Sequence, residues 1–248
     1  MNRHIAWSKL VVEGIAIVAS ILLAFSIDAW WDNKQQHDAE QMVLENLLED
    51  LKSKQELLIE MNRFSQAIVE SIEVLLRIGA GEQDEPDSAT VDQLIGDTWW
   101  ESNEALWDSA PMNLLVSGGN LSLISNPQLV QELGALQVAM DRVRNHYRKD
   151  QQFHLEIMTP FIMSHTNMIQ INAAMKHRPG SADESGYPSV NIRSRLSVDH
   201  EKLLSTLEFQ NLLAAKMERQ QDILYVGHPG VEKHLNTVVS MLQSELDK

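Results

Sequence analysis

The sequence predicts an all-α protein. One N-terminal transmembrane helix continues into a long amphipathic helix, which packs within an extracytoplasmic helical bundle. Three observations support this fold class. The stretch from Leu10 to Trp31 is strongly apolar. The chain from Trp30 to Ile78 has neither proline nor glycine and repeats apolar residues at heptad-like spacing. The remaining chain is punctuated by helix start and stop signals.

The apolar stretch is predicted to be a membrane helix over residues 10–31. A bilayer core of roughly 30 Å needs about 20 helical residues, which this stretch supplies. Trp7 on one side and Trp30 with Trp31 on the other are typical anchors at the two headgroup layers. Basic residues precede the span, so the positive-inside rule predicts a cytoplasmic tail over residues 1–9 and an extracytoplasmic domain over residues 32–248.

A cleaved signal peptide is the alternative interpretation of the same stretch. A basic start, an apolar run and small residues at Ala24 and Ser26 resemble a processing site. Glu13 inside the apolar run and the tryptophan pair argue instead for an uncleaved signal anchor. Cleavage is left open.

Glu13 is an ionisable group within the predicted span, which makes it a functional hypothesis. Its carboxylate could reach the cytoplasmic interface, contact a partner helix, or line a proton or ion path. Gly14 and Ser20 are small enough to permit close approach of another helix. We therefore predict a membrane-helix contact at Glu13, Gly14 and Ser20.

Composition excludes several classes of protein. The 248 residues suffice for one large or two modest domains, and 44% of them are hydrophobic. A net charge of −15 argues against a nucleic-acid partner, because phosphate contacts need a basic surface. The absence of cysteine excludes disulfides and thiolate catalysis. No cofactor is indicated.

Outside the membrane the sequence predicts a long helix over residues 32–78, which the glycine-rich acidic loop from Gly79 to Ser88 ends. Short helices follow over residues 90–118, with Thr90 as an N-cap and with Pro111 in the first turn of another helix. Three tryptophans in this region are predicted to fill the core, with a binding surface as the alternative: Trp99, Trp100 and Trp107.

Two further helical regions are predicted over residues 127–175 and 199–246. Asn126 and Pro127 form a start signal for the first, and Pro160 either kinks or ends it. The segment from Lys176 to Pro188 is predicted to be a flexible loop. Residues 227–230, which read Gly-His-Pro-Gly, must kink or split the second region.

A search for metal or catalytic sites gives only one weak pattern. His146, Asp150 and His154 are spaced four residues apart, which places them on one helix face as a possible metal-ligand set. However, the chain lacks the His-Glu-x-x-His pattern of zincins, and basic residues on the same helix oppose a cation. We predict neither a metal site nor catalytic residues.

Several segments resemble a known family. They are Glu13 to Asp32 with the leucine-rich helix Leu44 to Leu51, Ser117 to Asn126, and Leu207 to Leu213. Together they resemble the DUF6090-like group of uncharacterised bacterial single-pass membrane proteins, and they cover much of the chain. The resemblance implies a bacterial inner membrane and makes Glu13 and Trp30 family features. It brings no established activity.

The function predicted from these observations is a non-enzymatic membrane-anchored scaffold or accessory subunit. Its expected partners are the lipid bilayer and either further copies of itself or other membrane protein subunits. A homo-oligomeric ion or proton pathway using Glu13 is one alternative. A periplasmic ligand-binding sensor domain is another, and it would need a partner to signal.

Overall fold

The computed structural model describes residues 7–99, 107–116, 118–174 and 194–247, and for residues 7–12 it describes the backbone alone. Within these ranges the chain is helical and contains no β-strand. The helices are α1 (Trp7–Gly79), α2 (Ser88–Thr98), α3 (Ala110–Val116), α4 (Pro127–Phe153), α5 (Thr159–His165), α6 (Met168–Ala174), α7 (His200–Leu204), α8 (Leu207–Asp222) and α9 (His228–Leu246). A 3₁₀ turn, η2, covers Asn120–Leu123, and two π-helical turns, η3 and η4, cover His154–Met158 and Ile223–Gly227.

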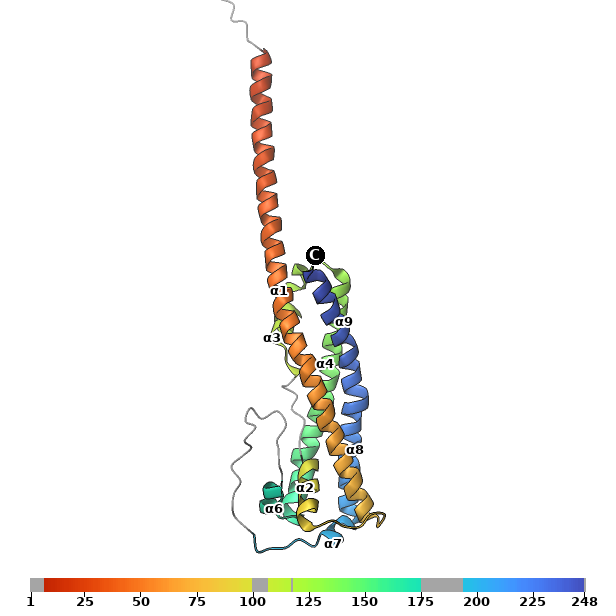
Figure 1. The fold of residues 1–248 in the computed structure, drawn as a ribbon. Coiled ribbons are helices and arrows are strands. Elements are labelled where there is room, and N and C mark those ends of the chain that lie inside the picture. Colours follow the sequence, from red (N-terminus) through yellow and green to blue (C-terminus); the bar gives the residue numbers. More distant parts are fainter. Residues whose placement is uncertain (1–6, 100–106, 117, 175–193, 248) are drawn as a thin grey trace, which may run out of the picture.

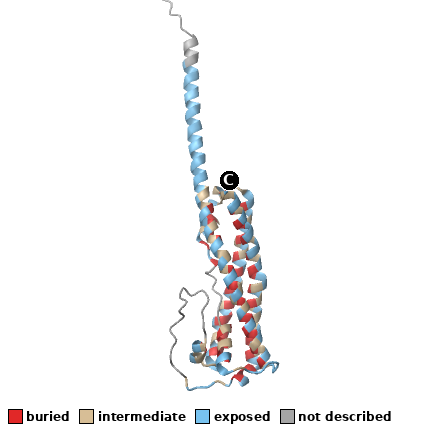
Figure 2. Cartoon of the chain, viewed as in Figure 1, coloured by how far each residue is buried: buried red, intermediate tan, exposed pale blue. Residues whose placement is uncertain are grey.

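Helix α1 is the longest element and runs without interruption for 73 residues. Its N-terminal part stands clear of the rest of the molecule and is exposed from Glu13 to Ala39 (Figures 1 and 2). Among the described residues, this helix is the one long and apolar enough to cross a membrane. The prediction of an apolar N-terminal helix that continues into a long amphipathic helix is confirmed.

Three long rods form the body of the molecule. They are the second half of α1, the continuous α4–η3–α5 helix, and the continuous α8–η4–α9 helix (Figure 1). The third rod runs antiparallel to α1, because Gln55 donates to Asn236 and Gln210 donates to the Gly79 carbonyl. The short helix α2 packs on α1 and against α6 at the far end of the bundle.

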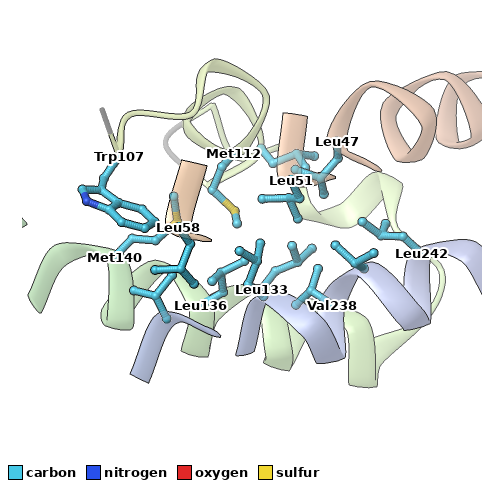
Figure 3. Close-up of a cluster of buried hydrophobic side chains, with 14 of the residues drawn as sticks. Leu47, Leu51, Leu58, Trp107, Met112, Leu133, Leu136, Met140, Val238 and Leu242 are labelled. Carbon is cyan, nitrogen blue, oxygen red and sulfur yellow. The ribbon is translucent and has the colours of Figure 1, made fainter. Parts of the chain in front are cut away.

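Two hydrophobic cores lie along the bundle. The first begins at Leu44 and joins α1 to α3, α4 and α9; ten of its side chains are labelled in Figure 3, Leu47, Leu51, Leu58, Trp107, Met112, Leu133, Leu136, Met140, Val238 and Leu242. The second joins the end of α1 to α2, α5 and α8 around Ile72, Leu75 and Phe209. Full burial of each such side chain contributes about 1.5–3 kcal/mol. The heptad-like positions of α1 are therefore core positions.

The tryptophans have different environments. Trp107 is fully buried in the first core, as predicted. Trp99 is partly buried and packs on the second core. Trp100 lies outside the described residues, as does the predicted loop from Lys176 to Pro188.

Helix boundaries differ from the sequence prediction at several places. The N-cap of α2 is Asp87, whose carboxylate accepts from the backbone and hydroxyl of Thr90, so the assignment of Thr90 as N-cap was wrong. The region 127–175 is divided at Thr166, which is extended. The region 199–246 is divided between α7 and α8, where Thr206 caps the second helix. Asn126 caps α4 as predicted.

Neither internal proline breaks its helix. Pro160 and Pro229 each lie two residues after the end of a π-turn. Proline lacks a donor and its ring clashes with the carbonyl four residues earlier, and the wider π-turn makes room for the ring. Of the two outcomes predicted for residues 227–230, a kink or a split, the split does not occur, and both rods remain continuous.

Candidate functional site

The two hydrophobic cores are separated by a cluster of polar side chains at mid-height of the bundle. We name it the central polar layer, and it consists of Asn62, Tyr147, Asp150, His154, Lys216, Gln220 and His228. All of them except Asn62 are buried. Because buried polar groups cost free energy unless they are paired, their hydrogen bonds determine what the layer can do.

A buried ion pair lies at the centre of the layer. Lys216 Nζ donates to both carboxylate oxygens of Asp150, at 2.8 and 2.9 Å, and both side chains are completely buried. Gln220, one turn after Lys216, also donates to Asp150. The pair joins α4 to α8. Removing one member of such a pair leaves an uncompensated charge and costs about 3–5 kcal/mol.

A second chain of hydrogen bonds joins all three rods. His228 Nδ1 lies 2.6 Å from Asn62 Oδ1 on α1, and His228 Nε2 lies 2.7 Å from the Tyr147 hydroxyl on α4. An amide oxygen only accepts, so Nδ1 carries the proton and Nε2 accepts from Tyr147. Burial lowers the pKa of His228 to about 4 and raises the pKa of Tyr147. The histidine is therefore neutral near pH 7.

His154 lies on the other side of the ion pair, at the start of η3. Its Nε2 is 3.2 Å from the Thr159 hydroxyl, to which Trp99 Nε1 also donates, and its ring stacks on Trp99. Burial lowers the pKa of His154 to about 4, and the charge of Lys216 acts in the same direction. This histidine is also neutral near pH 7.

The weak metal-ligand pattern is not assembled in the structure. Asp150 is held by Lys216 and Gln220, and His154 faces Trp99 and Thr159. His146 points elsewhere, with its Nδ1 3.9 Å from Asp222 on α8. In the part of the chain that the structure describes, no three metal-binding side chains converge. The layer is suited to fixing the register of three helices.

The residues predicted for membrane contact lie on the exposed part of α1. Glu13 is exposed, and nothing lies within 4 Å of a Cβ added to Gly14. The Ser20 hydroxyl donates to the Ala16 carbonyl of its own helix. All three positions are open to another helix, so the predicted contact and the predicted ion path at Glu13 would both need a second chain.

The predicted interface anchors are partly described. Trp30 and Trp31 are exposed, their ring centroids are 6.3 Å apart, and the Lys34 ammonium lies 5.9 Å from the Trp30 ring. The side chain of Trp7 lies outside the described residues. Their placement at headgroup layers remains a prediction.

Sequence reasoning missed both the central polar layer and the hollows of the bundle surface. A hollow of about 550 Å³ lies at the far end, between Met163 and Thr206. Two more adjoin each other along the boundary of the α4–η3–α5 rod with α8. The one sequence signal that could have indicated the central polar layer was Lys216, a charged residue within an apolar helix pattern, because a buried lysine needs a buried carboxylate as its partner.

Comparison of the chain with protein-family models, curated proteins and solved structures finds no match. The resemblance to the DUF6090-like group therefore stays a prediction.

Proposed function

We propose that this protein is a non-enzymatic membrane-anchored scaffold or accessory subunit that assembles with further copies or with other membrane proteins. The bundle would lie in the periplasm, and residues 10–31 would cross the bacterial inner membrane with the N-terminus in the cytoplasm. The charge asymmetry around the span supports this orientation.

One observation carries the proposal: the apolar segment and the bundle share a single uninterrupted helix. Residues 13–39 of α1 are exposed. Leu44, Leu47 and Leu51, which belong to the same helix, are buried in the first core. A helix has no hinge without proline, glycine or a π-turn, and the segment from Trp30 to Ile78 has none. The bundle is thus held at a fixed height and angle to the span.

The central polar layer supports the same proposal. A buried ion pair is weak evidence for stability, but it specifies one register among helices that could otherwise slide. Here Asp150 and Lys216 fix α4 against α8, and His228 fixes α9 against Asn62 of α1. A body with one fixed register suits a scaffold, because the relative positions of its binding surfaces do not change.

The test is the mass and composition of the complex that contains the full chain, extracted gently from its native membrane. We would measure its mass by light scattering after size exclusion and identify its proteins. A discrete homo-oligomer, or a defined complex with other proteins, supports the proposal. A chain that elutes as a monomer alone, from extractions that keep a known membrane complex intact, overturns it.

A further inference from the structure

The bundle carries a long groove on the boundary between the α4–η3–α5 rod and α8. Two adjoining hollows of about 560 and 360 Å³ make up this α4–α8 groove, and they share Phe153, Glu156 and Ile157. Phe161 and Leu212 line the larger hollow. No described residue of α1 lines either hollow, so the groove is separate from the helix that carries the apolar span.

Apolar side chains are exposed in both π-turns, and one of them, Ile157, lines both hollows of the groove. Leu155 and Ile157 in η3 are 57% and 53% exposed, and Tyr225 and Val226 in η4 are 62% and 50% exposed. A π-turn holds one residue more than an α-turn and so turns additional side chains away from the core. Both π-turns therefore present hydrophobic residues outward on the two rods that form the groove.

Lys149 on one wall of the groove lies level with Glu218 and Asp222 on the other, and the same hollow is also lined by Glu156 from η3 and Arg219 from α8. Asp150 pairs with Lys216, and His146 lies beside Asp222, so these stretches of α4 and α8 are level with each other. On the α4 wall Lys149 is exposed, next to Arg148. On the α8 wall Glu218 and Asp222 are exposed. Lys149, Glu218 and Asp222 all line the smaller hollow.

This charge pattern fits a second copy of the same chain. Copies anchored in one membrane are parallel, so a two-fold axis relating them must run along the membrane normal. Rotation about such an axis, placed along the groove, sets α4 of each copy against α8 of the other. Lys149 then faces Glu218 and Asp222 of the second copy, and the reciprocal contacts form as well.

We propose that the α4–α8 groove is a self-association surface, on which a second copy of this chain docks in parallel. The inference rests on the proposed scaffold function and specifies its interface. The exposed Ile157 of each copy packs into the groove of the other, and the pairing of Lys149 with Glu218 and Asp222 of the other copy sets the orientation.

The test uses the absence of cysteine from the chain. Ile157→Cys introduces a single thiol close to the proposed axis, where it faces its own counterpart. The matched control is Ile59→Cys, a 56% exposed isoleucine on α1. In native membranes under mild oxidation, we expect a disulfide-linked dimer of the full chain for Ile157→Cys and not for Ile59→Cys. Equal cross-linking of the two, or cross-linking of Ile157→Cys to a different protein, overturns the proposal.

Charge reversal tests the orientation. In the Ile157→Cys background, Lys149→Glu sets an acidic side chain against Glu218 and Asp222 of the second copy, and Glu218→Lys combined with Asp222→Lys sets basic side chains against Lys149. Each variant alone faces like charges, so its cross-linked dimer should fall by roughly tenfold. Co-expression of the two should restore a mixed dimer, in which every facing pair is opposite in charge. Loss without restoration overturns the proposal, and circular dichroism of each variant shows that the helices are retained.

The outcomes separate this interface from the scaffold function. An oligomer or mixed complex of defined mass, without cross-linking at Ile157→Cys, overturns the groove interface and leaves the scaffold function standing. A monomer by light scattering overturns both.

Discussion

Lys216 carries a buried positive charge at the centre of the bundle. It is fully buried and satisfies both oxygens of Asp150. Lys216→Met would leave the carboxylate buried without its counter-charge. We expect the free energy of unfolding to fall by about 3–5 kcal/mol, as measured by denaturation of the full chain in detergent.

The double variant Asp150→Leu with Lys216→Met is the control for this prediction. It removes both charges and fills the space with apolar groups, so it should be markedly more stable than Lys216→Met alone. If the double variant is no more stable than Lys216→Met alone, the loss of unfolding free energy arises from packing and not from the unpaired charge.

The two buried histidines make stability depend on pH. The pKa of both His228 and His154 is lowered to about 4, whereas an unfolded chain has histidines near 6.5. Between these values the unfolded state binds more protons, so stability falls as pH decreases. The stabilisation is complete above about pH 6.5 and is lost progressively toward pH 4.

We expect His228→Gln to flatten this decline. Unfolding of the full chain would be measured between pH 4 and 7.5, with His37→Gln, at an exposed position of α1, as the control. The wild type and the control should lose stability to the same extent, by about 3 kcal/mol per buried histidine at most, while His228→Gln loses less. An unchanged slope in His228→Gln would show that folding does not lower the pKa of His228.

At the scale of elements, the π-turn η4 depends on a close approach of α4. A Cβ added to Gly227 would lie 3.0 Å from Val143 Cγ2, and Val143 is fully buried. Gly230, three residues later in α9, has open space around it. Gly227→Ala should therefore destabilise the bundle by about 1–3 kcal/mol. Gly230→Ala should stabilise it by about 0.5–1 kcal/mol through helix propensity. Thermal unfolding of the two variants beside the wild type measures the difference.

Most of the long elements could be predicted from sequence, because their signals are local. The heptad-like leucines of α1 are recognised from their spacing along the chain. The Asn126 cap with Pro127 is recognised from adjacent residues. The continuity of the rods through Pro160 and Pro229 could not be predicted, since it depends on π-turns that packing between helices stabilises. Asp87 was missed as a cap because Thr90 is an equally good capping residue by type, and only the backbone distinguishes them.

The central polar layer illustrates the same limit. His146, Asp150 and His154 share a helix face by spacing, yet the partner of Asp150 is Lys216, which lies 66 residues away in sequence. No local pattern specifies which buried lysine meets which aspartate. The sequence therefore marked Asp150 as unusual but assigned it to a metal hypothesis that the structure does not assemble.

For the whole molecule, the rigid connection between span and bundle leads to a prediction about helical phase. Insertion of two alanines after Gln36, in the exposed part of α1, turns the span by about 200° relative to the bundle. Insertion of seven residues at the same place turns it by only about 20° net. If span and bundle both contribute contacts to one assembly, the two-residue insertion should reduce the mass of the extracted complex and the seven-residue insertion should preserve it.

Both insertions lie outside the two cores, so the folding of the bundle serves as the internal control for this experiment. Circular dichroism and thermal unfolding should be unchanged in both. Equal masses for the two variants would show that the assembly does not use the span and the bundle together.

The exposed segment of α1 between Trp31 and Leu44 has a geometric consequence. It holds the first core about 20 Å beyond the tryptophan pair, and the far end of α1 at Gly79 about 70 Å beyond it, at about 1.5 Å per residue. With residues 10–31 in a bilayer, the length of α1 would set the distance of the bundle from the lipid. In the proposed membrane arrangement it leaves a gap between the lipid and the bundle that other membrane-bound chains could occupy, and it places the acidic loop after Gly79 at a set distance from the lipid.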